Sequence, residues 1–403
     1  MAFITYEESL KNLYQSVSET KAKERLFIDQ AQGRILAEDI VADHNSPAFP
    51  TSAMDGYAIK YDDQHMGRIQ ILGDLPAGTY NDEELMGGYC VKTFTGSLMT
   101  KGSDTLIPIE NVEVEGNEIL IKEPVPKGFS VRPVGENYEE GEVLIPKGST
   151  IGFAEIGVLA SLNISQVSVY KKPTVAVVST GSEILDVGEK QTNPSQIYSS
   201  NQFTLEAIAK KAGAQPTRMP LAKDDKETLR EVILKSLEDH DIVVTTGGVS
   251  VGDYDFVKDI LKDLDAHYIT EGVILKPGQH IKIVKVANKY IVALPGFPYS
   301  STVTFILYVI PLIKMLTGQK PQLPYVKAVL RQTYKKRSKK TEFAACNLYY
   351  ENGTYVIDFE GKKSGSSAIL TNMLGHTGLL EVDRESGDLE AGSLVDVINL
   401  EAL

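Results

Sequence analysis

The pattern of hydrophobic and polar positions divides the chain into four parts. Residues 6–17, 28–42 and 150–164 place apolar side chains three and four apart, which predicts three amphipathic helices. Between the second and the third, residues 46–146 read as short strands joined by glycine-containing turns. The pattern therefore indicates a β domain inserted into a helical segment.

From residue 173 onward, strands and helices alternate. Strands are expected at 174–179, 216–220 and 242–246, helices at 201–212, 225–239 and 253–263, strand-like stretches at 280–286 and 289–296, and an apolar helix at 299–316. Asp224 and Glu227 have capping-box spacing at the start of the second of these helices. Alternation of this kind is typical of a doubly wound α/β sheet with helices on its faces. Residues 321–403 are strand-rich and predict a separate β domain without a long helix.

Length and charge narrow the functional classes. A chain of 403 residues is long enough for two to four domains. Its net charge of −13 and the lack of a Lys/Arg stripe that could follow a phosphate backbone disfavour nucleic-acid binding. The N-terminus lacks a signal-peptide pattern, and Pro311 and Lys314 interrupt the most apolar stretch, so we expect no membrane span. A small-molecule partner and a cytoplasmic location fit best.

Three predicted strand ends carry glycine turns: "STGSEI" at 179–184, "TTGGVSVGDYD" at 245–255 and "LPGFP" at 294–298. Any one of them could be an ordinary connection, but parallel strands would bring all three to one crevice. Glycine lacks a Cβ, so a phosphate can approach the backbone there. Glu183, Asp253 and Asp255 stand at the same rim and would repel a phosphate unless a hard cation bridged them. The pattern therefore predicts an anion site with Mg²⁺.

Other motifs are weaker by themselves. The inserted region offers Asp55 in "SAMDGYA", Thr95 in "FTGS", and Arg132 and Glu136 in "VRPVGE". Alone, Asp55 is part of an ordinary turn and Arg132 an ordinary ion-pair partner, so a structural role is the simpler interpretation. The histidines and the two cysteines occur in no HExxH, CxxC or triad-like context, which disfavours zinc, disulfide and histidine chemistry. No GxGxxG or GxxxxGK[ST] motif occurs.

Taken in order, "SAMDGYA", "FTGS", "RPVGEN", "STGSEI", "TTGGVSVGDYD", "KPG" and "LPGFP" resemble the molybdopterin molybdenumtransferases, the MoeA family, to which the C-terminal domain of gephyrin is related. The resemblance spans about residues 5–400. It implies a homodimer in which the inserted β domain of one subunit faces the α/β domain of the other. The implied parts are an elongated helical segment (1–45 and 147–172), an inserted β domain (46–146), a molybdopterin-binding α/β domain (173–320) and a C-terminal β barrel (321–403).

The resemblance also implies an activity: cleavage of adenylyl-molybdopterin with Mg²⁺ and insertion of molybdate at the dithiolene, with release of AMP. The implied catalytic residues are Asp55, Thr95, Glu183, Asp253 and Asp255, of which the last three would hold Mg²⁺. Asp55, Thr95, Arg132 and Glu136 would come from the facing subunit. The implied substrate-binding residues are Arg132, Glu136, Thr180, Gly181, Ser182, Thr246, Gly247, Gly248, Ser250, Lys276, Pro295, Gly296 and Pro298. The upstream molybdopterin adenylyltransferase is the expected protein partner.

Four positions depart from the family pattern. This chain has Asn137, Gln279, Phe297 and Ala345 at positions where the family pattern has Asp, Lys, Asn and Arg, respectively. Loss of positive charge weakens anion recognition, unless neighbours such as His280 or Lys282 compensate. The departures leave open a non-catalytic paralogue that binds molybdopterin, or an enzyme that uses tungstate. An adenylyltransferase built on the same α/β domain is disfavoured, because this chain keeps the Asp55 and Thr95 segments.

Overall fold

A computed structural model describes residues 3–18, 20–222, 225–248, 256–264, 266–363 and 365–403. The chain forms two compact units, of which the first comprises residues 1–37, 148–153 and 166–403 and the second residues 38–147 and 154–165. Each unit has its own hydrophobic core.

A six-stranded sheet lies at the centre of the first unit. Its strand order is β16-β13-β17-β21-β20-β18; the first four strands are parallel, β20 runs antiparallel to β21, and β18 runs antiparallel to β20. The strands are β13 (Thr174–Ser179), β16 (Gln215–Arg218), β17 (Ile242–Thr246), β18 (His267–Glu271), β20 (Lys282–Val286) and β21 (Lys289–Leu294). The central strands are buried on both faces, which explains their unbroken runs of valine and isoleucine.

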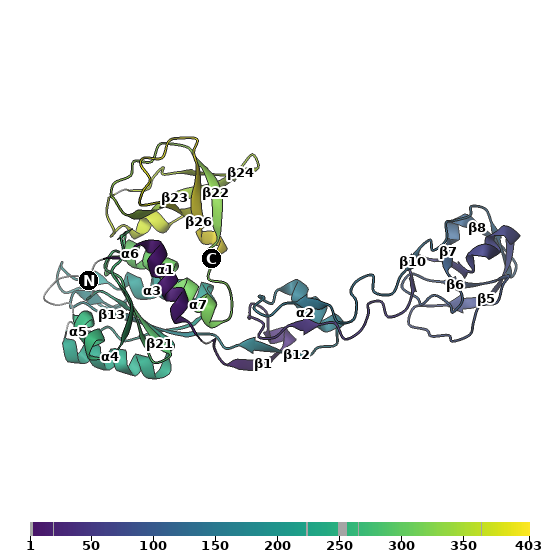
Figure 1. The fold of residues 1–403 in the computed structure, drawn as a ribbon, viewed down its shortest axis with the longest axis horizontal. Helices are drawn as coiled ribbons and strands as arrows, with labels where there is room; N and C mark the ends of the chain where they lie inside the picture. Colours follow the sequence, from purple (N-terminus) through teal and green to yellow (C-terminus); the bar gives the residue numbers. More distant parts are fainter. Residues whose placement is uncertain (1–2, 19, 223–224, 249–255, 265, 364) are drawn as a thin grey trace. The chain divides into compact units, whose positions relative to one another are not determined.

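Helices cover both faces of this sheet, which confirms the doubly wound fold. Val175 and Val177 of β13 face one layer, whereas the alternate residues Ala176 and Val178 face the other. Figure 1 shows α4 and α5 on one side of the sheet and α1, α3, α6 and α7 on the other. The helices are α1 (Tyr6–Ser16), α3 (Ser200–Lys211), α4 (Lys226–Asp239), α5 (Phe256–Asp263), α6 (Pro298–Thr304) and α7 (Ile310–Leu316).

The N-cap residue of α4 is not the one expected from the sequence. The side chain of Asp225 accepts a hydrogen bond from the backbone N–H of Thr228 at 2.8 Å and caps the helix. The predicted capping residue, Asp224, lies outside the described residues. The N-cap is therefore Asp225.

The apolar helix at 298–316 continues through Pro311 instead of breaking there. The π-helical segment η4 (Phe305–Val309) joins α6 to α7. Pro311 has no N–H to donate, and a wider π turn before it accommodates its ring. By length and composition alone this helix could span a membrane, but 89% of its apolar window is buried inside the protein.

The predicted helix at 28–42 is wrong. The structure has only a 3₁₀ turn, η1 (Ile28–Gln30), and then an extended chain. Gly33 adopts φ +74°, and the backbone N–H groups of Leu36 and Ala37 donate to Ser149 and Ser168. These donors are committed to distant carbonyls, so an i→i−4 ladder cannot form. Next to this segment, β1 (Lys23–Phe27) pairs with β12 (Gln166–Tyr170).

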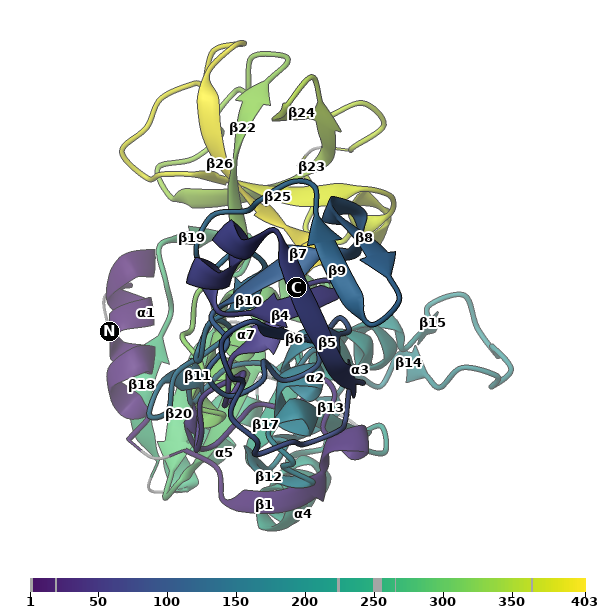
Figure 2. The same ribbon diagram turned by 90° about the vertical axis from the view of Figure 1, so that its right-hand side faces the viewer.

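Residues 325–399 contain a closed five-stranded barrel, which confirms the predicted C-terminal β domain (Figure 2). Around the barrel, each strand pairs with the next in the order β23-β24-β22-β26-β25, and β25 pairs back to β23. The strands are β22 (Tyr325–Leu330), β23 (Thr341–Glu351), β24 (Thr354–Asp358), β25 (Thr377–Val382) and β26 (Leu394–Asn399). Phe343 and Ala345 of β23 and Leu379 of β25 join the core formed by α6, η4 and α7, so the barrel packs directly on the α/β layer.

A carboxyl group on this barrel makes stability depend on pH. Burial raises the pKa of Glu381, and a hydrogen bond from Tyr325 Oη at 2.5 Å only partly offsets that effect. The other acidic groups that raise this pKa are Asp396, Glu7 and Asp383. A raised folded-state pKa contributes stability that is present below the unfolded pKa and lost as pH rises through the folded value.

We therefore expect Glu381→Gln, which cannot ionise, to be more stable than the parent at pH 8. The expected gain in Tm is roughly 2–4 °C, the effect of about 1 kcal/mol on a domain of roughly 200 residues. The gain should vanish near pH 4, where the parent carboxyl is protonated. Calorimetry at the two pH values checks this, and an equal gain at both would contradict it.

The second unit is the inserted β region. Its main sheet has the order β7-β4-β6-β5-β9-β8. The strands are β4 (Gly56–Ile59), β5 (Arg68–Leu75), β6 (Tyr89–Thr93), β7 (Thr105–Pro108), β8 (Val112–Glu115) and β9 (Glu118–Ile121). Two short strand pairings join β2 (Ile40–Val41) to β11 (Val143–Ile145) and β3 (Thr51–Ser52) to β10 (Val131–Arg132), and Thr51 also forms an isolated bridge with Leu98. The predicted third helix is α2 (Phe153–Ser161).

Candidate functional site

The three glycine turns of the α/β sheet lie at one edge. β13, β17 and β21 are adjacent and parallel, so their carboxyl ends meet. The backbone N–H of Thr180 donates to the Thr246 carbonyl at 3.3 Å, and that of Gly247 donates to the Leu294 carbonyl at 3.1 Å. The three turns therefore meet at one edge of the sheet.

Glycine is required at two positions where these turns touch, Gly247 and Gly248. Gly247 has φ +95°, and a Cβ there would lie 3.1 Å from the Thr180 carbonyl oxygen. Gly248 has φ +66°, and a Cβ there would lie 2.8 Å from a methyl group of Val257. A Cβ on Gly296 would contact the Gly247 Cα at 3.5 Å. The glycines allow the turns to approach one another while keeping backbone N–H groups near the edge.

A polar side chain from α3 fixes the third turn. Asn201 donates from Nδ2 to the Gly296 carbonyl at 2.8 Å, and its Oδ1 accepts from Ser301 Oγ at 3.2 Å. Pro295 and Pro298 flank this turn, and Pro298 is the first residue of α6. Asn201 was not among the predicted site residues, because its place in the first turn of a helix gave no sign of this contact.

Glu183 lies on the turn after β13, exposed beside Ser182. A Cβ on Gly181 would lie 2.8 Å from Glu183 Oε2, so glycine makes room for this carboxylate. Just beyond it, β14 (Ile184–Leu185) pairs with β15 (Ile197–Tyr198) at the base of a projecting loop (Figure 2). Ser250, Asp253 and Asp255 lie outside the described residues. Among the residues that the structure describes, no three His, Cys, Asp or Glu side chains form a group that could hold a metal ion.

Lys276 reaches the same edge from the "KPG" turn. It belongs to β19 (Leu275–Lys276), which pairs with β23 of the barrel so that Lys276 lies opposite Glu342. Lys282, at the start of β20, lies opposite Ala293 near the end of β21, so the turn between β19 and β20 is at the carboxyl edge. A Cβ on Gly278 would lie 2.2 Å from the Thr304 side chain, so this turn packs tightly on α6.

Glu342 is a buried carboxylate at the junction between the barrel and the α/β layer. Burial alone would raise its pKa, but hydrogen bonds from Ser338 Oγ at 2.7 Å and Tyr334 Oη at 2.9 Å outweigh burial and lower it. Lys276 Nζ, 3.4 Å away, acts in the same direction. Glu342 therefore stays ionised and balances the charge of Lys276.

The four residues that depart from the family pattern lie in different environments. Phe297 is 60% exposed at the start of α6. Ala345 is buried, and its backbone N–H donates to Tyr299 Oη at 2.8 Å. Asn137 donates from its backbone N–H to the Ser46 carbonyl at 2.8 Å in the second unit. Gln279 Oε1 accepts a hydrogen bond from Lys340 Nζ.

The second unit brings its own candidates together around β3. The residues of β3 bond to the "FTGS" segment on one side, where the Ser52 N–H donates to Ser97 O at 2.8 Å. On the other side β3 pairs with β10, and Thr51 lies opposite Arg132. Arg132 Nε donates to Glu136 in an ion pair, as the simpler interpretation of that residue predicted. Both side chains are more than 40% exposed, so this pair adds little stability.

Asp55 and Thr95 are in direct contact. Asp55 Oδ1 accepts hydrogen bonds from both the backbone N–H and the Oγ1 of Thr95, each at 2.8 Å. Both bonds lower the pKa of the exposed Asp55 carboxyl, and the bond from the backbone N–H has the larger effect. Asp55 is therefore held as an oriented carboxylate at the start of β4.

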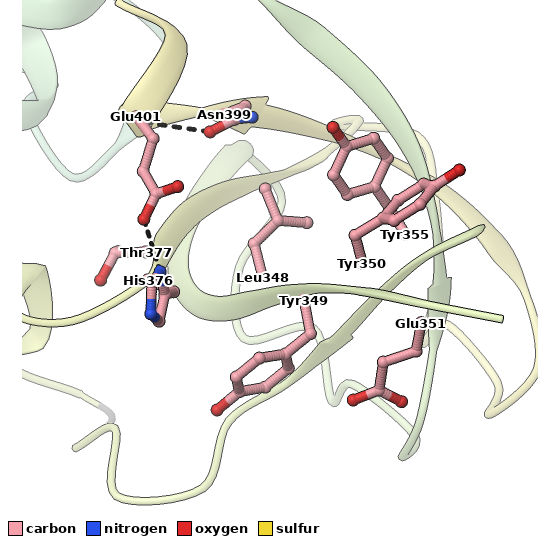
Figure 3. A pocket seen from close by; sticks show the side chains of 9 residues that line it. All are labelled: Leu348, Tyr349, Tyr350, Glu351, Tyr355, His376, Thr377, Asn399 and Glu401. Carbon is pink, nitrogen blue, oxygen red and sulfur yellow. Dashed lines mark hydrogen bonds and ion pairs between the residues drawn. The ribbon is translucent and has the colours of Figure 1, made fainter. Parts of the chain in front are cut away.

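A separate hollow lies on the barrel and contains none of the predicted site residues (Figure 3). Its volume is about 360 Å³. Tyr349, Tyr350 and Tyr355 line it, and His376 Nδ1 pairs with Glu401 Oε1 at 2.6 Å along its edge. The hollow is therefore distinct from the edge at which the glycine turns meet.

Comparison with known proteins decides the family. Three family descriptions match in succession: "MoeA N-terminal region (domain I and II)" at residues 4–163, "Probable molybdopterin binding domain" at 176–315 and "MoeA C-terminal region (domain IV)" at 327–400. A molybdopterin molybdenumtransferase of Staphylococcus epidermidis is 30% identical over 99% of this chain and 96% of its own length. This chain belongs to the molybdopterin molybdenumtransferase family.

Other MoeA-family relatives agree. The enzyme of the same name from Nostoc is 34% identical over 76% of this chain and 72% of the relative. The crystal structure of a molybdopterin biosynthesis MoeA protein from Pyrococcus horikoshii has a TM-score of 0.84 and 28% identity, and the match covers 99% of this chain and all of that one. The resemblance predicted from the motifs is confirmed, as is the enzyme class, a transferase of molybdenum cofactor biosynthesis, at the level of the family.

Proposed function

We propose that this chain transfers molybdenum from molybdate to adenylyl-molybdopterin and releases AMP. The observation that carries the proposal is the convergence of the turns at Thr180, Gly247 and Gly296 on one sheet edge in a member of this family. Open α/β sheets bind ligands at this edge. Backbone N–H groups there donate to phosphate oxygens, and glycines with positive φ let the phosphate come close.

The chemistry requires two anions to meet. Molybdate and the pyrophosphate of adenylyl-molybdopterin repel each other, so the site must supply oriented donors and positive charge where negative charge develops. The hydroxyl groups of Thr180, Ser182 and Thr246 and the backbone N–H groups of Gly248 and Gly296 are suited to bind phosphate oxygens, whereas the Gly247 N–H already donates to the Leu294 carbonyl. Lys276 supplies a cation at the rim of the same edge.

One described carboxylate at this edge, that of Glu183, would suit Mg²⁺. The Glu183 carboxylate is exposed and forms no hydrogen bond or ion pair with the described residues, which leaves its oxygens available to a hard cation. Glu183, with Asp253 and Asp255, would hold Mg²⁺, which would neutralise charge on the pyrophosphate. Glu183 would also orient water or substrate beside the turn.

The decisive assay mixes the purified protein with adenylyl-molybdopterin, Mg²⁺ and molybdate, and follows AMP. We expect release of AMP that depends on both Mg²⁺ and the oxyanion. Replacement of molybdate by tungstate tests the choice of metal oxyanion. Tight binding of adenylyl-molybdopterin without AMP release would instead identify a non-catalytic paralogue, the alternative that Phe297 and Ala345 favour.

We also propose that the enzyme is a cytoplasmic homodimer that receives its substrate from the upstream adenylyltransferase. Each complete site would combine the α/β edge of one subunit with Asp55, Thr95, Arg132 and Glu136 of the other, as the family resemblance implies. The four-part domain division, with its boundaries at residues 45, 146, 172 and 320, is part of the same proposal.

The shared site predicts complementation between variants. Asp55→Ala should lose roughly 10²-fold or more in AMP release while the dimer remains intact, because the oriented carboxylate is exposed and supports no core contact. Mixing it with Glu183→Ala subunits should restore part of the activity, since one of the two sites in a mixed dimer is complete. Proven subunit exchange without any recovery would place the whole site within one chain.

A further inference from the structure

The carboxyl edge of the α/β sheet has a cation that comes from the barrel. Lys340 immediately precedes β23, and the backbone N–H of the next residue, Thr341, donates to the Ile274 carbonyl at 3.1 Å. This bond and the β19–β23 pairing bring Lys340 to the "KPGQH" turn, where its Nζ donates to Gln279 Oε1. The two residues are 61 positions apart in the sequence.

The charge of Lys340 is not balanced by a carboxylate in the described part of the chain. Lys276 faces Glu342 at 3.4 Å, and Lys282 faces Glu271 at 3.8 Å. Lys340, by contrast, is half-buried and is held by a neutral amide oxygen, with no ion pair to any described residue. A half-buried cation without a counter-ion attracts an anion more strongly than a lysine that is already paired.

We infer that Lys340 binds a tetrahedral oxyanion group of the substrates at this edge, in place of the lysine that the family pattern has at Gln279. The inference rests on the proposed function, because that function supplies the anions, molybdate and the phosphate of the nucleotide. Gln279 orients the ammonium group through its Oε1. In this inference the compensation for the lost lysine comes from Lys340 and not from Lys282, which faces Glu271.

Lys340→Gln removes the charge at nearly constant size. We expect it to weaken binding of molybdate, of AMP, or of both by roughly tenfold or more, the effect of losing one charge-assisted hydrogen bond. Lys339→Gln is the matched control, since Lys339 is the exposed neighbour in the same loop and should bind both anions like the parent. The double variant Gln279→Lys with Lys340→Gln moves the positive charge from position 340 to position 279. It should recover most of the lost affinity.

Calorimetric titration of the full chain with molybdate alone and with AMP alone makes the test independent of turnover. Weaker molybdate binding in Lys340→Gln assigns the lysine to the oxyanion, and weaker AMP binding assigns it to the nucleotide phosphate; either result supports the inference. Unchanged affinity for both anions, or no recovery in the double variant, overturns it. A protein that binds these anions but releases no AMP would contradict the proposed function and leave the role of Lys340 standing.

Discussion

Glu183→Ala should fold like the parent protein and release AMP roughly 10²-fold or more slowly. The side chain is exposed, and no described residue depends on its carboxylate, so its removal costs little stability. The rate falls because the carboxylate acts on the charge that develops at the pyrophosphate, either through Mg²⁺ or by orienting water.

Glu189→Ala is the matched control for Glu183→Ala. Glu189 lies in the same projecting loop, where its Oε2 accepts a hydrogen bond from the backbone N–H of Asp186. It is not at the glycine turn, so its replacement should leave AMP release near the parent rate. A normal rate in Glu183→Ala, or an equal loss in both variants, would show that this turn is not the catalytic edge.

Gly56→Ala should destabilise the inserted β region by about 3 kcal/mol or more. Gly56 lies in β4 between β6 and β7, and a Cβ there would lie 2.3 Å from the backbone carbonyl oxygen of Ile107. Because the obstacle is backbone and not a flexible side chain, β4 and the neighbouring edge strand β7 must move apart. The displacement would also disturb Asp55, which immediately precedes this strand.

Gly157→Ala provides the comparison in the same unit. Gly157 lies within α2, and a Cβ there would have no heavy atom within 4 Å, so alanine should stabilise the protein by up to about 1 kcal/mol. Urea unfolding followed by circular dichroism and tyrosine fluorescence measures both variants. Parent-like stability of Gly56→Ala would mean that β4 and β7 are not as close as the structure places them.

Local signals predicted most of the α/β domain. The strands near Val175, Val243 and Ile291 are apolar without interruption, and the helix that starts after Asp225 repeats its apolar residues every three to four positions. The 28–42 segment has a similar helical spacing, yet its backbone donors bond to Ser149 and Ser168. A periodic pattern reports which residues are apolar, but it does not report which distant carbonyls compete for the backbone.

The sequence by itself determined the family, most strands and helices of the α/β domain, and the turns at Thr180, Gly247 and Gly296, because these depend on short motifs and on the conformational freedom of glycine. It missed β18, the antiparallel edge strand. Only the tertiary structure decided how the parts of a site come together. It placed Asp55 in hydrogen-bonding contact with Thr95, fixed the Gly296 turn through Asn201, and brought Lys340 to Gln279 across 61 residues. These contacts depend on strand pairing between distant segments, and the residue types at either end carry no local record of that pairing.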